Sequence, residues 1–227
     1  MRLPLFDPPI SSGKRVLARV DFNVPVQQNE IVDDFRIKKT LPLIKDLLRK
    51  NARVVLLSHL TERKTHKSFQ GLIPALGRVC STPITFALDI PAVRALQKNP
   101  SPPSLILLEN LRAFPGEEKN DPAFAKELAT LGDIYINEDF SQSHRPYASL
   151  VTLPQFLPSF IGPLFQNEIE KLSEALNPPY PFLLILGGVK FETKLGILEH
   201  FLPIADRIFI GGALPFNARP WCSGTDL

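Results

Sequence analysis

Polar side chains gather directly after four of the apolar runs in this sequence. They are carboxylates, amides, arginines and histidines: Asp21 and Asn23 after the first run, Ser58 and His59 after the second, Glu109, Asn110 and Arg112 after the third, and Asn137, His144 and Arg145 after the fourth. Each of them alone is better explained as a cap or a turn residue. Four runs that change from apolar to polar at the same end are instead typical of a ligand site.

The arginines and a histidine in this set indicate a small anionic ligand. An arginine guanidinium is a planar fork that matches the oxygens of phosphate and carboxylate groups. Such donors would come from Arg36, Arg112, Arg145 and His59. Arg36 follows Asp33 and Asp34, so the alternative for Arg36 is a plain surface ion pair that contributes about 0 to 1 kcal/mol.

A second candidate phosphate site lies in the stretch LILGGVKFETK. An apolar run ends there in a glycine pair and two lysines follow, at Gly187, Gly188, Lys190 and Lys194. We expect a helix to begin near Phe191, which would place backbone amides and two lysines on one helix face beside a bound anion. The lysines would oppose the helix dipole unless an anion is bound or Glu192 offsets them.

Alternating strand and helix patterns must position these residues. Near-continuous apolar runs predict buried parallel strands over residues 15–22, 52–59, 104–110, 132–138, 181–188 and 207–212. Apolar residues at three- and four-residue intervals predict helices over residues 35–51, 69–80, 91–97, 121–131, 167–176 and 191–202. Pro42 either kinks the first helix or marks a start after Thr40. The alternation predicts a doubly wound, Rossmann-like α/β parallel sheet, followed by an incomplete second α/β domain.

The domain organisation is predicted from a break in this alternation. Residues 153–163 contain three prolines and a glycine, and an amphipathic helix pattern follows them. We therefore expect a ligand-binding N-terminal domain over residues 1–163, a connecting helix and linker over residues 164–180, and a second domain over residues 181–227.

Charge, cysteines and hydropathy exclude several classes of protein. The net charge of +3 is too small for a nucleic-acid-binding surface, and we expect no nucleic-acid partner. Cys80 and Cys222 lie far apart without metal-ligand spacing, so we expect neither a disulfide framework nor a zinc site. The N-terminus lacks an apolar signal region and no run reaches the length of a membrane span, which predicts a cytoplasmic protein without a membrane partner.

Seven segments resemble one family, phosphoglycerate kinase, in the same order and with similar spacing. They read RVDFNVP, DDFRIKKTLPLIKDLL, VVLLSHL, LLENLRAFPGEEKNDPAFAKELA, INEDFSQSHRPYAS, LILGGVKFETKLGILEHFL and ADRIFIGGAL, and they span about Arg15 to Leu214. The resemblance implies two Rossmann-like domains that close on a hinge. It also implies a glycolytic enzyme that transfers a phosphoryl group between 1,3-bisphosphoglycerate and ADP, giving 3-phosphoglycerate and ATP, with Mg²⁺ carried by the nucleotide.

The resemblance also implies roles for residues that match the family's motifs. Asp21 and Asn23 would contact the hydroxyl and carboxyl end of the substrate, and Arg36 would lie against the reacting group. The distal phosphate of the substrate would be held by His59, Arg112, His144 and Arg145. Lys194 would follow the transferred phosphoryl group, and the nucleotide side would be lined by Gly187, Gly188, Lys190, Gly211 and Gly212.

Two segments depart from the family's usual pattern. The family usually reads SHLGRP, so Thr61 and Glu62 replace a glycine and a phosphate-binding arginine, and we expect Arg63 to take over from that arginine. The segment NEDFSQSHRPYAS stands where the family more often reads NDAFG followed by HRAH. Tyr147 there replaces a frequent histidine, while His144 and Arg145 are kept.

From Pro215 onward the sequence no longer resembles the family, and we expect a truncated gene end. The remaining strands, the adenine pocket and the acidic residue that helps to place Mg²⁺ would then be missing. We expect an enzyme by family, with little activity for the 227-residue chain alone. The alternatives are a non-catalytic 3-phosphoglycerate-binding remnant and, more remotely, a different small-anion-binding protein. A monomer is expected from the family, with association through the exposed second domain.

Overall fold

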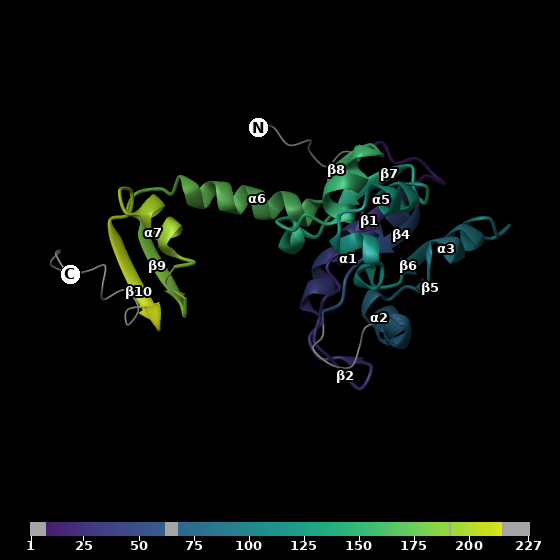
Figure 1. Ribbon diagram of the computed structural model, residues 1–227, viewed down its shortest axis with the longest axis horizontal. Helices are drawn as coiled ribbons and strands as arrows, with labels where there is room; N and C mark the ends of the chain where they lie inside the picture. Colours follow the sequence, from purple (N-terminus) through teal and green to yellow (C-terminus); the bar gives the residue numbers. More distant parts are fainter. Residues whose placement is uncertain (1–7, 62–67, 191, 215–227) are drawn as a thin grey trace. The chain divides into compact units, whose positions relative to one another are not determined.

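The computed structural model describes residues 8–61, 68–190 and 192–214 (Figure 1). The chain divides into two compact units, Met1–Glu170 and Lys171–Leu227. Helix α6 (Pro163–Leu176) spans this division. The domain boundaries predicted after residues 163 and 180 stay a prediction.

Unit 1 contains a six-stranded sheet in the order β5-β6-β4-β1-β7-β8. The strands are β1 (Arg15–Arg19), β4 (Arg53–Leu57), β5 (Thr85–Ala87), β6 (Leu105–Leu108), β7 (Ile134–Asn137) and β8 (Ser159–Ile161). All neighbouring strands of this sheet are parallel. A short antiparallel hairpin, β2 (Val26–Gln27) and β3 (Glu30–Ile31), follows the first strand.

Helices cover both faces of this sheet because successive strand residues point to opposite sides. Val16 and Ala18 of β1 pack in the cluster that contains the apolar residues of α1 (Phe35–Arg49) and α2 (Ile73–Cys80). Leu17 packs in the other cluster, with residues of α3 (Ile90–Gln97) and α5 (Pro122–Ala129). The predicted doubly wound parallel sheet is therefore confirmed (Figure 1).

Short helical turns connect the larger elements. They are η1 (Gln70–Leu72), η2 (Leu111–Ala113), α4 (Pro115–Glu118), η3 (Phe140–Gln142), η4 (Ala148–Thr152) and η5 (Leu153–Gln155). Asp89 and Asp121 begin α3 and α5 by accepting hydrogen bonds from the backbone amides of Ala92 and Ala123.

Helix α1 continues through Pro42, so a helix start after Thr40 is wrong. A proline inside a helix removes one backbone hydrogen bond. The buried residues Ile37, Leu43, Ile44 and Leu47 form one apolar face of α1, whereas Pro42 faces solvent. The burial of this face outweighs the lost hydrogen bond.

Unit 2 contains a parallel two-stranded sheet, β9 (Leu183–Gly188) and β10 (Arg207–Gly212), with α7 (Leu195–Phe201) between the strands in sequence. Its described apolar core is small. Leu186 and Leu214 are the buried members, and Leu195, Leu198 and Ile210 pack against them.

Four strands were not predicted from the sequence. β2, β3, β5 and β8 are two or three residues long, too short for a period to appear. β8 lies inside residues 153–163, where we expected the alternation of strands and helices to break. These residues add the sixth strand to the sheet, beside β7.

Candidate functional site

The polar strand ends lie at one edge of the sheet in unit 1. The chain passes from β1 to β4 on one side and returns, after β5 and β6, to β7 on the other side of β1. Open parallel sheets bind ligands outside the carboxyl ends of the strands at such a reversal. The segments that leave β1, β4 and β7 there carry Asp21, His59 and Asp139.

Asp21 and Arg36 form the direct contact between two predicted site residues. Arg36 Nη1 donates a hydrogen bond to Asp21 Oδ2 at 3.0 Å, and the backbone amide of Asn23 donates to Asp21 Oδ1 at 3.0 Å. Asp34 pairs with Lys38 at 2.9 Å. Arg36 therefore does not form the surface ion pair with Asp33 or Asp34 that was the alternative for it. It pairs instead with Asp21 at the end of β1.

A cavity of about 400 Å³ opens beside this pair. Its walls come from the end of β1, the first turns of α1 and α6, and the segment after β7: Asp21, Phe35, Arg36, Lys39, Glu138, Phe140, Ser141, Leu164, Asn167 and Glu168. Half of the Arg36 side chain is exposed to solvent. A guanidinium at a partly open cavity can exchange its contact with Asp21 for an anionic ligand.

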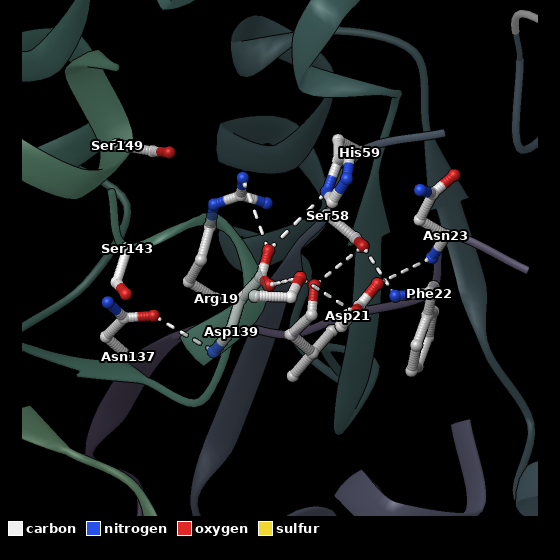
Figure 2. A network of polar contacts seen from close by, with 12 residues as sticks. Arg19, Asp21, Phe22, Asn23, Ser58, His59, Asn137, Asp139, Ser143 and Ser149 are labelled. Atoms are coloured by element: carbon white, nitrogen blue, oxygen red, sulfur yellow. Dashed lines mark hydrogen bonds and ion pairs between the residues drawn. The ribbon is translucent and has the colours of Figure 1, made fainter. Parts of the chain in front are cut away.

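Asn23 and Ser58 hold the loops of the site together. The side-chain oxygen of Asn23 accepts a hydrogen bond from the backbone amide of Thr61 at 2.8 Å. Ser58 Oγ donates to the backbone oxygen of Val20 and accepts from the backbone amide of Phe22. These bonds fix the end of β1 against the end of β4, as Figure 2 shows for Ser58 and Phe22.

His59 lies in a buried cluster of charges with Arg19 and Asp139 (Figure 2). Asp139 Oδ2 is 3.5 Å from Arg19 Nη2 and 3.5 Å from His59 Nδ1. The side chains of Arg19 and Asp139 are fully buried, and that of His59 is 2% exposed. The fully buried charge of Arg19 is therefore paired with that of Asp139.

The acids in the segment after β7 differ in pKa. Burial alone would raise the pKa of Asp139, but the contact with His59 and the charge of Arg19 outweigh burial and hold this pKa below its usual range. Burial raises the pKa of Glu138 to about 7, although the backbone amides of Leu164 and Phe165 donate to its carboxyl group. Asp139 is therefore ionised at neutral pH, whereas Glu138 titrates there.

The remaining predicted phosphate-binding residues lie in two loops. Arg112 follows β6 and lies 5.9 Å from the ring centre of Tyr147, with its Nε 3.6 Å from Glu118. This contact places Arg112 beside the loop that carries His144 and Arg145, both of which are exposed. Arg63 lies outside the described residues, so its expected replacement of the lost arginine stays a prediction.

Three residues of this site were missed from the sequence. Arg19, Asp139 and Ser141 contact His59 or Asp21, yet none was singled out. A signal existed for Arg19, because a charged residue inside an apolar run needs a buried partner. The partner itself lies 120 positions away in sequence, and only the fold brings it near.

In unit 2, two glycine pairs lie side by side at the ends of β9 and β10. The parallel register pairs Gly187 with Gly211 and Gly188 with Gly212. Gly212 has φ +66°, and a Cβ on it would lie 3.0 Å from the backbone oxygen of Gly188. Glycine is therefore required at position 212 by backbone conformation and by close approach.

The helix expected to begin near Phe191 begins at Leu195, so this prediction is wrong. Phe191 itself lies outside the described residues. Lys190 and Lys194 do not share a helix face, because Lys190 belongs to the preceding turn, where its backbone oxygen accepts from Thr193 Oγ1. A Cβ added to Gly188 would lie 3.7 Å from Lys194 Cε, an ordinary van der Waals contact, so Lys194 lies against the end of β9. The helix therefore starts only after this turn.

The described residues contain no group of three His, Cys, Asp or Glu side chains arranged to hold a metal ion. In the same part of the chain, no helix has both the length and the apolar character needed to cross a membrane.

Comparison with known proteins gives one consistent family. Among curated relatives named phosphoglycerate kinase, one from Thermosipho africanus is 43% identical over 212 residues, covering 90% of this chain and 53% of the relative. One from Rubrobacter xylanophilus is 44% identical over 214 residues, covering 90% and 54%. The chain thus spans about half the length of the curated relatives it matches.

Solved structures of phosphoglycerate kinases share the fold. The structure from Coxiella burnetii matches with a TM-score of 0.80 and 32% identity over 96% of this chain and 56% of that one. The structure from Pyrococcus horikoshii matches with a TM-score of 0.83 and 29% identity over 100% and 59%. The sequence model of the family described as phosphoglycerate kinase matches residues 9–218, so this chain belongs to the phosphoglycerate kinase family.

Proposed function

We propose that unit 1 binds 3-phosphoglycerate and 1,3-bisphosphoglycerate at the carboxyl end of its sheet. The observation that carries this proposal is the contact between Asp21 and Arg36 on the wall of a cavity of about 400 Å³. A carboxyl or acyl phosphate group of the ligand would take the free hydrogen-bonding positions of Arg36. The ligand hydroxyl and carboxyl end would also contact Asp21 and Asn23.

The phosphate at the other end of the ligand would be held by His59, Arg112, His144 and Arg145. His59 Nδ1 lies 3.5 Å from Asp139 Oδ2, and Arg112 lies beside Tyr147, three residues from His144. A ligand of three carbons separates its two anionic ends, which suits cationic groups that come from different strand ends. Arg63 is proposed as an additional contact.

We propose the reversible transfer of a phosphoryl group between 1,3-bisphosphoglycerate and ADP as the activity of the protein, with Arg36 and Lys194 next to the reacting group. Mg-ADP or Mg-ATP supplies the acceptor or donor phosphate when bound. The backbone at Gly187, Gly188, Gly211 and Gly212 would approach the nucleotide, and Lys190 and Lys194 would neutralise its charge. Positioning and charge neutralisation account for most catalysis in such in-line transfers.

Calorimetric titration with 3-phosphoglycerate tests the substrate site. We expect Arg36→Ala to weaken binding about tenfold or more, because a charged hydrogen bond to the ligand is lost. Lys38→Ala is the matched control, since Lys38 is on the same helix and pairs with Asp34. No binding of 3-phosphoglycerate by the unaltered chain, or equal losses in the two variants, would contradict the proposal.

A second candidate function is phosphoglycerate binding without turnover. It is favoured by the two-stranded sheet of unit 2, where Leu183, Ile185 and Phe209 are 54%, 67% and 60% exposed. A coupled assay with ATP and 3-phosphoglycerate separates the two candidates. ADP release by the chain supports the kinase activity, whereas binding in calorimetry without ADP release supports the second candidate.

We propose the cytoplasm as the location, since the glycolytic reaction of the family belongs there. The proposed partners are the two phosphoglycerates and the nucleotide, without nucleic acid or membrane. The proposed state is a monomer that associates through exposed apolar residues of unit 2.

A further inference from the structure

Asp139 contacts three polar groups from three segments of the chain. Its Oδ2 lies 3.5 Å from both Arg19 Nη2 and His59 Nδ1, and its Oδ1 accepts a hydrogen bond from Ser141 Oγ at 2.8 Å. The carboxylate has no exposed surface. The carboxylate is therefore held by one hydrogen bond, from Ser141, and by two longer contacts with Arg19 and His59.

Ser141 continues these contacts to the cavity. Its hydroxyl group also lies 3.0 Å from Asp21 Oδ2, the oxygen that accepts from Arg36 Nη1 at 3.0 Å. A serine hydroxyl carries one hydrogen, which it can donate to only one carboxylate at a time. The second carboxylate must then be balanced by its own cation, Arg36 for Asp21 and Arg19 for Asp139.

Polar groups therefore follow one another across the site, with the neutral hydroxyl of Ser141 between the carboxylates of Asp21 and Asp139. The order is Arg36, Asp21, Ser141, Asp139 and then His59 together with Arg19. Arg36 and Asp21, which are proposed to bind the carboxyl end of the ligand, lie at one end of this network. His59, which is proposed to bind the phosphate end, lies at the other. A connected polar network has a narrower set of geometries than separate contacts have.

We propose that Asp139 and Ser141 are positioning residues that hold His59 and Asp21 at the separation that a three-carbon phosphorylated acid requires. This inference rests on the proposed function. Asp139 holds the imidazole of His59, and Ser141 holds the carboxylate of Asp21. Both residues lie in NEDFS, where the family more often reads NDAFG, so the contact belongs to this chain and does not follow from the family resemblance.

The turn that carries Ser141 does not depend on its hydroxyl group. The side-chain oxygen of Asn137 accepts from the backbone amide of Asp139 at 3.0 Å, and Ser143 Oγ donates to the backbone oxygen of Phe140 at 2.7 Å. Ser141 itself is exposed and lines the cavity. The contacts of the Ser141 hydroxyl with Asp21 and Asp139 can therefore be removed without removing the hydrogen bonds that stabilise the turn.

Binding of two ligands to two variants tests the inference. The probes are 3-phosphoglycerate and inorganic phosphate, measured by calorimetry. We expect Ser141→Ala to weaken 3-phosphoglycerate binding about tenfold but phosphate binding by no more than about twofold, since Asp139 keeps its contacts with Arg19 and His59 while Asp21 loses its contact with the segment after β7. Asp139→Asn acts on His59, so we expect it to weaken binding of both ligands about tenfold.

Matched controls and a double variant separate positioning from folding. Ser143→Ala loosens the same turn without removing a contact to Asp21 or Asp139, and Asp133→Asn removes a carboxylate from the other end of β7, so we expect each to weaken 3-phosphoglycerate binding by less than about twofold. Ser141→Ala combined with Asp139→Asn should weaken 3-phosphoglycerate less than the two single effects multiplied, because both break one network.

The failures of the two proposals are distinguishable. If the unaltered chain binds no 3-phosphoglycerate, the proposed function fails. If it binds but Ser141→Ala binds as tightly as Ser143→Ala, the positioning role of Ser141 is wrong. If Asp139→Asn changes thermal stability but neither ligand affinity, Asp139 serves only as a counter-charge for Arg19 and its positioning role is wrong.

Discussion

Arg19 shows how a single side chain can bear on both stability and binding. It ends β1 with a fully buried guanidinium beside Asp139. Removing one partner of a buried ion pair costs more than the pair itself contributes, because the other charge stays buried without a partner. The effect of a substitution at Arg19 should therefore be much larger than that of an exposed arginine on the same strand.

We expect Arg19→Met to lower the free energy of unfolding by about 3 kcal/mol. Arg15→Met is the control, since Arg15 also lies on β1 but pairs with Asp133 at a partly exposed position. We expect that variant to lose about 1 kcal/mol. Urea unfolding followed by circular dichroism measures both. Similar losses would show that the pair of Arg19 with Asp139 is as well solvated as the exposed one.

Glu138 makes stability depend on pH. Its pKa is raised by burial from 4.5 to about 7, so the folded protein keeps a proton that the unfolded chain releases between these values. The free energy of unfolding should therefore fall as pH rises through this window. We expect the fall between about pH 5 and 7.5 to be about 2 kcal/mol larger in the unaltered chain than in Glu138→Gln. Urea unfolding at both pH values tests this, and parallel pH profiles would contradict it.

At the scale of elements, apolar run length decided what the sequence could predict. β4 and β6 are runs of buried Val, Leu and Ile and were predicted within a few residues. β8 has only Ser159, Phe160 and Ile161, all partly buried, and prolines nearby hide it. α7 begins later than its apolar spacing suggested because residues 192–194 form a turn.

The same reasoning explains how much of the site could be predicted. Asp21 directly follows β1, and Arg36 contacts Asp21 there. At such strand ends the type of side chain alone was enough to predict a site residue. Asp139 and Ser141 act through contacts with residues far away in sequence, as Ser141 does with Asp21 across 120 positions. No local pattern carries such a pairing, so it required the topology that places β7 beside β1.

Gly162 joins β8 to α6 at a position that no side chain can occupy. A Cβ there would lie 1.9 Å from Glu138 Oε2 and 2.6 Å from its Cδ. Glu138 cannot move away easily, because it is buried and accepts from the first amides of α6. We expect Gly162→Ala to lower the free energy of unfolding by about 2 kcal/mol. Gly77→Ala, whose Cβ would meet only an ordinary contact at 3.8 Å, is the control in thermal unfolding.

At the scale of the whole molecule, the two units differ in how well they bury apolar residues. Both faces of the sheet in unit 1 are covered, whereas Leu183, Ile185 and Phe209 of unit 2 are more than half exposed. Neighbouring exposed apolar residues on a sheet favour association, while a single one does not.

We therefore expect the chain to associate with increasing concentration. Ile185→Lys, at a position 67% exposed on β9, should reduce this association in sedimentation velocity. Leu88→Lys is the control, because Leu88 is 60% exposed in unit 1. Sedimentation that is independent of concentration, or an equal effect of both substitutions, would contradict the role of the β9 surface.

The two neighbouring acids after β7 have a consequence for how the gene can change. Glu138 receives the amides that begin α6, while Asp139, the next residue, lies against Arg19 and His59. Adjacent residues of an extended segment point to opposite sides, so inserting or deleting one codon just before them would exchange their places. A substitution at Glu138 or Asp139 changes the contacts of one side chain. An insertion or deletion in this segment would instead disturb both the first turn of α6 and the proposed ligand pocket.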